Sequence, residues 1–152
     1  MERGVFAVIG FLIGFILAAA LFTQHTLPQI TANVISAPTG NIQDDNITVY
    51  PARVVIKVAN ATISNYGATG SMTPLLDGNA HGIRIKPESA DQISVGDLVT
   101  FNASGTMVIH RVVEKGNDSQ GIYFITKGDS NPVNDKPIHF SDIYYKTIGI
   151  LY

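Results

Sequence analysis

The sequence of 152 residues contains no cysteine, which excludes disulfide bonds, thiol catalysis and thiolate metal sites. It also has no strong excess of either charge, because 10 basic side chains stand against 12 acidic ones. This balance gives the whole chain no electrostatic attraction to nucleic acid or to anionic lipid. The His-Glu-x-x-His spacing of zinc proteases and the Gly-x-Ser-x-Gly elbow of α/β-hydrolases are missing too. We therefore expect no metal, no cofactor and no nucleic acid partner.

The sequence beyond its first 22 residues also lacks a sustained helical repeat of apolar side chains. Short β-branched runs separated by Gly, Pro and Asn occur instead, and such runs are typical of strands. Strands are expected at Arg53–Ala59 (with Ala61–Tyr66 as its extension toward Ser71), Gly82–Lys86, Leu98–Phe101, Met107–Glu114, Gly121–Lys127 and Tyr144–Leu151. The polar composition of Lys115–Gln120 predicts a hairpin loop. The soluble part is thus predicted to be mostly β.

The N-terminal segment from Val5 to Phe22 is a run of 18 residues without a charge. A helix of this length spans roughly 27 Å, close to the hydrocarbon thickness of a bilayer. Arg3 precedes the run and no basic residue follows it closely, so we expect a cytoplasmic N-terminus and an extracytoplasmic remainder. A cleavable signal peptide is the alternative, because Ala18–Ala20 offer small residues near the end. We favour an uncleaved anchor, since a signal-peptide core has only about 7–15 residues.

These patterns divide the chain into three regions. Residues 1–22 form the membrane anchor, and residues 51–152 form the β-rich domain. Residues 23–50 are polar and rich in turn formers, and they show neither a helical nor an alternating period. We interpret them as an extracytoplasmic tether or an extra strand.

Two positions in the β-rich domain combine groups that acyl transfer requires. Gly70 permits a tight turn directly before Ser71, and Pro74 stiffens the chain after it. His110 lies in a β-branched run, where alternation places Val108 and Val112 on its own face of the strand. An imidazole is the natural general base near neutral pH. Taken singly, the serine is an ordinary turn residue and the histidine an ordinary core residue.

A third segment gives these two a context, because Thr126-Lys127-Gly128-Asp129-Ser130-Asn131 follows and leads to Asp135. In this order the three segments resemble the catalytic boxes of type I signal peptidases, the membrane-bound serine proteases that remove signal peptides. The resemblance is closest to the archaeal and endoplasmic-reticulum branch, where a histidine replaces the general-base lysine of bacterial enzymes. It covers about residues 67–150 and the anchor. It implies a compact catalytic β-domain behind one transmembrane helix, without the large second domain of the bacterial enzymes.

The resemblance also assigns roles to residues. It implies that Ser71 is the nucleophile, that His110 is the general base and that Asp135 orients the imidazole. Asp129 is the competing carboxylate, and we give it a supporting role. In most relatives the serine follows the membrane helix closely, whereas Ser71 lies 49 positions after Phe22.

Neighbours of the serine complete the expected site. The Ser71 backbone N–H is the first candidate donor to the oxyanion that forms during acyl transfer. Thr69 matches a family position whose hydroxyl assists, although capping a turn is an equally simple role. Met72 and Pro74 are expected to shape the substrate floor, with ordinary core packing as the alternative for Met72.

Together with the anchor, the resemblance implies a single-pass membrane serine endopeptidase that cleaves exported preproteins after small residues. Its partners would be secretory preproteins and the lipid bilayer, with a Sec translocon or accessory subunits as further candidates. One alternative is a protease dedicated to a single surface or pilin-like protein. Another is a catalytically inactive extracytoplasmic β-domain that binds an exported partner.

Overall fold

The computed structural model of the chain describes residues 36–38, 40 and 42–152. In this described part, no helix is long and apolar enough to cross a membrane. The expected anchor at residues 1–22 and most of the segment 23–50 lie outside the described residues. The end of that segment, from Ile47 to Tyr50, forms a strand.

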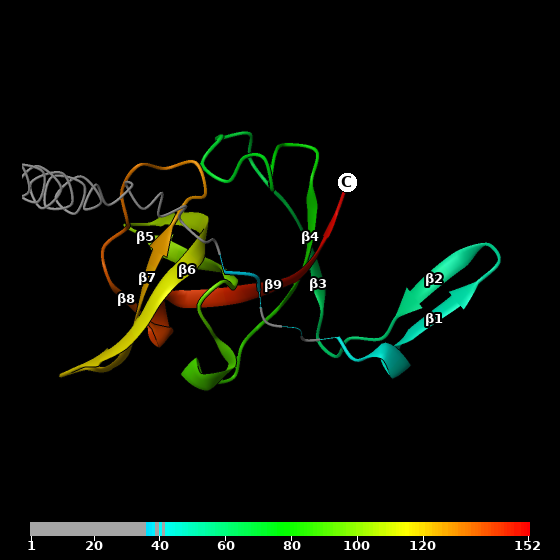
Figure 1. Ribbon diagram of the computed structural model, residues 1–152, viewed down its shortest axis with the longest axis horizontal. Coiled ribbons are helices and arrows are strands. Elements are labelled where there is room, and N and C mark those ends of the chain that lie inside the picture. Colours follow the sequence, from blue (N-terminus) through cyan, green and yellow to red (C-terminus); the bar gives the residue numbers. More distant parts are fainter. Residues whose placement is uncertain (1–35, 39, 41) are drawn as a thin grey trace, which may run out of the picture. The chain divides into compact units, whose positions relative to one another are not determined.

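The described residues form two antiparallel sheets and three short 3₁₀ helices (Figure 1). One sheet contains only β1 (Ile47–Tyr50) and β2 (Arg53–Ile56). The other has seven strands in the order β3-β4-β9-β5-β6-β7-β8. These strands are β3 (Thr62–Asn65), β4 (His81–Ile85), β5 (Leu98–Ala103), β6 (Thr106–Asp118), β7 (Gly121–Lys127), β8 (Ile138–His139) and β9 (Ile143–Leu151). The 3₁₀ helices are η1 (Asp44–Asn46), η2 (Ala90–Gln92) and η3 (Phe140–Asp142). The prediction of a mostly β domain is confirmed.

The predicted hairpin between β6 and β7 is present, but its loop is shorter than the expected 115–120, because β6 continues to Asp118 and pairs there with Gly121. Polar side chains do not prevent strand pairing when they point to solvent, since the ladder bonds are made by the backbone. Gly116 also has a packing reason to lie in the strand. A Cβ at Gly116 would lie 2.5 Å from the Tyr123 ring, so the missing side chain makes room for its cross-strand neighbour.

Apolar side chains gather on both faces of the seven-stranded sheet. Successive residues of β5 enter different clusters, since Leu98 packs in one and Val99 in the other. The larger cluster contains Ile93, Val99, Phe101, Val112, Phe124, Ile138 and Ile143. The smaller cluster contains Met72, Leu76, Ala80 and Leu98. Burial on both faces explains why the start of β5 reads as a continuous run of buried residues.

One buried ion pair supports the centre of the sheet. Lys146 of β9 is 2% exposed, and its Nζ lies 2.7 Å from Asp97 Oδ2. The same ammonium group donates to the Gln92 carbonyl oxygen at 2.8 Å. Lys146 thus has a structural role, because it joins β9 to the segment before β5.

Candidate active site

The expected nucleophile lies on a turn that its own backbone closes. Gly70 has a φ of +78°, a conformation that favours glycine. The Thr73 backbone N–H donates to the Gly70 carbonyl oxygen at 3.2 Å, and the Thr73 hydroxyl donates to the same oxygen at 2.8 Å. The Ser71 side chain is held at the centre of this turn.

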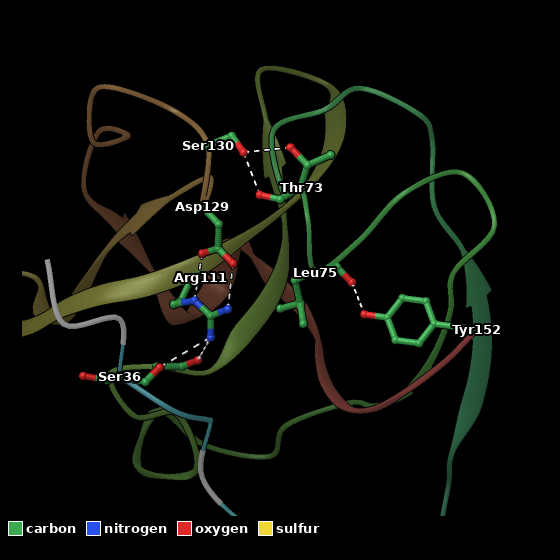
Figure 2. Close-up of polar contacts among 8 residues, drawn as sticks. Ser36, Thr73, Leu75, Arg111, Asp129, Ser130 and Tyr152 are labelled. Carbon is green, nitrogen blue, oxygen red and sulfur yellow. Dashed lines mark hydrogen bonds and ion pairs between the residues drawn. The ribbon is translucent and has the colours of Figure 1, made fainter. Parts of the chain in front are cut away.

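The segment 128–131 binds the serine turn from a distant part of the chain. The Ser130 N–H donates to the Ser71 carbonyl oxygen at 2.9 Å. The Ser130 hydroxyl donates to the Thr73 carbonyl oxygen at 2.6 Å, and the Thr73 and Ser130 hydroxyl oxygens are 2.8 Å apart (Figure 2). At Gly128, a Cβ would lie 2.7 Å from the Ser71 carbonyl oxygen. The serine turn at residues 70–73 and the segment 128–131 are therefore in direct contact.

The C-terminus of the chain meets the same turn region. The Tyr152 hydroxyl donates to the Leu75 carbonyl oxygen, as Figure 2 shows. Leu76, the next residue, is buried in the smaller cluster together with Met72. The residue after the serine is thus anchored in the core, which limits movement of the turn.

His110 lies in β6 opposite Val99 of β5. Its side chain is only 8% exposed. The imidazole centroid lies 6.1 Å from the Phe101 ring centroid, and Val112 on the same strand face is fully buried. The imidazole therefore borders the larger apolar cluster, and one side of the ring is shielded from water.

The carboxylate next to His110 belongs to Asp135. Asp135 Oδ2 lies 2.6 Å from His110 Nδ1. The same oxygen accepts a hydrogen bond from the Thr126 hydroxyl at 2.7 Å, and the Asp135 backbone N–H donates to the Thr126 carbonyl oxygen at 2.8 Å. Thr126 is fully buried and pairs with Val112 across the sheet. This threonine fixes the carboxylate against the imidazole.

Thr126 is a residue that the sequence patterns left without a role. Strand pairing between β6 and β7 places it on the face of the sheet that also carries His110 and Val112. That pairing register was the signal that could have identified it.

Asp129, the other carboxylate of the segment 126–135, binds Arg111 and not His110. Asp129 accepts two hydrogen bonds from Arg111, from Nε at 2.8 Å and from Nη2 at 2.7 Å (Figure 2). Both side chains are less than one-tenth exposed. Arg111 Nη1 also donates to the Gly96 carbonyl oxygen at 2.9 Å and to the Ser36 carbonyl oxygen at 3.5 Å. Arg111 was likewise assigned no role from the sequence, and it connects four separate segments of the chain.

Ser71 and His110 line one cleft of about 750 Å³. Within the described residues, the hydrogen-bonding partner of the Ser71 hydroxyl is Thr69, whose Oγ1 lies 3.3 Å from Ser71 Oγ. Met72 also lines the cleft, and it packs in the smaller cluster with 3% of its surface exposed. Pro74 is exposed and does not belong to the lining, so the expectation that it shapes the substrate floor is wrong. Leu76 belongs to the lining.

The cleft walls come from two sides. One wall is the segment Ser64–Gly67 at the end of β3, and the other is Thr106–Ile109 at the start of β6. Tyr144, Tyr145 and Arg84 also line the cleft, and the Arg84 guanidinium carbon lies 3.8 Å from the Tyr145 ring centroid. The cleft is therefore lined mostly by apolar and aromatic groups, with the hydroxyl and the imidazole among them.

Comparisons with family models, with curated proteins and with solved structures give no match to this chain. Its chemistry is therefore inferred from the geometry of the described residues. That geometry brings a hydroxyl on a fixed turn and an imidazole–carboxylate pair to the same cleft. Serine-dependent acyl transfer uses this set of groups.

Proposed function

We propose that this protein is a membrane-bound serine endopeptidase of the signal peptidase type, which removes signal peptides from exported preproteins after small residues. The observation that carries the proposal is the contact of 2.6 Å between His110 Nδ1 and Asp135 Oδ2, beside the cleft that Ser71 also lines. Neither the serine turn nor the histidine strand would support it singly.

The proposed mechanism begins with the tautomer of His110. When Nδ1 donates its proton to Asp135, Nε2 is left with a free lone pair that accepts the proton of Ser71 Oγ. The hydrogen bond between Ser71 and His110 forms as substrate binds, since catalytic contacts commonly tighten at that step. Ser71 Oγ then attacks the scissile carbonyl carbon. The imidazolium returns the proton to the leaving amine, and water releases the acyl-enzyme.

Charge that develops on the carbonyl oxygen also needs donors. The Ser71 backbone N–H and the Thr69 hydroxyl are proposed for this role. Thr69 Oγ1 lies 3.3 Å from Ser71 Oγ, so a small movement brings it to the oxygen of a substrate bound at the serine. Loss of one such donor typically lowers kcat by about 10²–10³.

An extended peptide fits the cleft walls. β3 stands at the end of the strand order and pairs on one side with β4. The end of β3 and the two residues after it, Ser64 to Gly67, border the cleft. A peptide that adds a strand at this edge would place its scissile bond next to Ser71.

The proposed location is the outer face of the cell membrane. The apolar run from Val5 to Phe22 would anchor the chain with its N-terminus in the cytoplasm, because Arg3 precedes the run. Secretory preproteins reach this face while their signal peptides are still in the bilayer. The enzyme and its substrate would then share the membrane.

The deciding experiment uses the full-length protein in membranes and measures cleavage of a preprotein. Ser71→Ala and His110→Ala should each abolish cleavage, and Asp135→Ala should lower it strongly. Ser119→Ala and His81→Ala, which change exposed residues of the same types, are the matched controls. Full activity of either of the first two variants would end the proposal.

A covalent serine-directed probe separates the protease from an inactive binding domain. Labelling should occur at Ser71 in the folded protein and should be lost in the His110→Ala variant. Absence of labelling in protein that binds exported chains would favour the binding domain.

A further inference from the structure

The hairpin of β1 and β2 carries an aliphatic surface. In its register, Ile47 lies opposite Ile56, and Val49 lies opposite Val54, so these four side chains share one face. Their exposed fractions are 41% for Ile47, 39% for Ile56, 74% for Val49 and 58% for Val54. We call this surface the ribbon face.

The ribbon face is unusual for a sheet of this size. Among the described residues, β1 and β2 pair with each other and with no other strand. A two-stranded hairpin is at best marginally stable in water, and it gains stability when its apolar face is covered. The opposite face carries Thr48 and Val55, which are partly buried, and next to the turn Tyr50 and Arg53, which are exposed. All four aliphatic side chains of the ribbon face remain exposed.

The area of the ribbon face argues against a protein as its stable partner. Four partly exposed aliphatic side chains present a few hundred Å². A stable protein interface buries about 800 Å² on each partner, so a second copy or another protein would need further contacts. A bilayer has no such requirement when the chain is already held at its surface, because tethering raises the local concentration.

The residues around the turn of the hairpin also fit a membrane interface. Tyr50 and Arg53 flank the turn, and the Arg53 guanidinium carbon lies 4.8 Å from the Tyr50 ring centroid. Tyrosine and basic side chains are typical at the level of lipid headgroups. The basic residue at this turn is Arg53, whereas the acidic residues Asp44 and Asp45 of η1 precede the opposite, open end of the hairpin, near Lys57. The turn is therefore the end of the hairpin whose charge suits anionic headgroups.

The position of the hairpin in the sequence permits this contact. Ile47 lies 25 positions after Phe22, the last residue of the expected anchor. A chain of that length spans up to roughly 80–90 Å when extended, so it does not hold the hairpin away from the bilayer surface.

We propose that the ribbon face inserts into the interfacial layer of the outer leaflet of the membrane. The inference depends on the proposed anchor at residues 5–22 but not on the peptidase chemistry. Its consequence is geometric. A second membrane contact would fix the height of the cleft above the bilayer, which the long connection between Phe22 and Ser71 does not do by itself.

The cysteine-free sequence allows a direct test with single-cysteine variants of the full-length protein. Val49→Cys on the ribbon face is labelled with an environment-sensitive fluorophore, and the protein is reconstituted into phosphatidylcholine–phosphatidylglycerol vesicles. Ser119→Cys, in the exposed turn between β6 and β7, is the matched control. Lipids that carry a quencher in the acyl chain should quench the label at position 49 several-fold more than the label at position 119.

Two outcomes would overturn the inference. Equal quenching at the two positions would show that the ribbon face does not enter the bilayer. Energy transfer between labels at position 49 that disappears on dilution with unlabelled protein, without lipid quenching, would show that a second copy covers it instead. Because labelling needs no catalysis, the Ser71→Ala background gives the same answer, and failure of the proposed peptidase activity remains a separate result.

A variant of the ribbon face extends the test to processing. Val49→Glu combined with Val54→Glu should lower cleavage of a membrane-bound preprotein several-fold, while cleavage of a short soluble peptide stays unchanged. The control is Thr48→Glu, on the other face of the hairpin. Equal processing by the double variant and the wild type would contradict the role of the contact in positioning the cleft.

Discussion

Arg111 and Asp129 form a two-point ion pair, and His110, the residue before Arg111, pairs with Asp135. His110 and Arg111 are consecutive residues of β6, so their side chains leave opposite faces of the strand. His110 pairs with Asp135 and Arg111 pairs with Asp129, both from the segment 128–135. The two carboxylates are therefore divided by strand geometry, one toward the cleft histidine and the other toward the arginine that connects the surrounding loops.

This division predicts that Asp129 matters first for stability. Asp129→Asn leaves the buried Arg111 guanidinium without its counter-charge, and breaking a buried pair costs about 3–5 kcal/mol. The free energy of unfolding should fall by that amount in chemical denaturation of the detergent-solubilised protein. Asp118→Asn is the control, because Asp118 pairs with His139 on the surface and its loss should change stability little. Equal effects of the two variants would contradict the structural role of the buried pair.

Asp135, unlike Asp129, should matter more for activity than for stability. In Asp135→Asn the side chain keeps its shape, but an amide nitrogen facing His110 Nδ1 favours the tautomer that cannot accept the serine proton. We expect kcat/KM for preprotein cleavage to fall by about 10²–10⁴ with a much smaller change in Tm. Asp77→Asn, at an exposed turn, is the matched control. An active Asp135→Asn enzyme would show that this carboxylate does not orient the base.

Local sequence patterns were sufficient for several parts of the fold. β7 runs from Gly121 to Lys127 as its composition indicated. The alternation around His110 also placed the imidazole on an apolar face, next to Val112. Both features depend on neighbours within a few residues, where the period of two in a strand determines direction.

The rest depended on contacts between distant segments. Which aspartate faces His110 is decided by the path of residues 128–135, which no local period describes. Arg111 gave no signal because a buried arginine is recognisable only once its partner, Asp129, is placed. The extension of β6 through Gly116 was missed for a similar reason. Its cause is the Tyr123 ring on the neighbouring strand.

Gly128 provides a prediction about how the serine turn is held. A Cβ at this position would lie 2.7 Å from both the Ser71 carbonyl oxygen and the Asn131 side-chain nitrogen. Gly128→Ala therefore forces the segment 128–131 away from the turn, which should destabilise the protein by about 1–3 kcal/mol. Because Ser71 moves with its carbonyl group, preprotein cleavage should fall as well.

The control for this prediction is Gly149→Ala in β9, where the new Cβ would meet Ile83 at the ordinary contact distance of 3.4 Å or more. Chemical denaturation and the cleavage assay are applied to both variants. If Gly128→Ala retained the stability and activity of Gly149→Ala, the contact between the segment 128–131 and the serine turn would not be needed to hold Ser71.

Tyr66 should make stability depend on alkaline pH. Burial raises the pKa of the Tyr66 phenol, against the lowering effects of its hydrogen bond to Thr147 and of the nearby Arg84 charge. A pKa that is higher in the folded state contributes stability below the unfolded value of about 10, and this contribution is lost as the pH rises through the folded value. The free energy of unfolding should therefore decrease above about pH 10.

Tyr66→Phe tests this linkage and keeps the ring that fills the space over Gly82. At neutral pH the variant should be less stable by about 1 kcal/mol, because the buried Thr147 hydroxyl loses its partner. Above about pH 10 its unfolding free energy should decline less steeply than that of the wild type, since one titrating group has been removed. Tyr144→Phe, at the exposed side of the same cleft, is the control. Parallel curves for wild type and Tyr66→Phe across the alkaline range would show that the buried phenol does not titrate with unfolding.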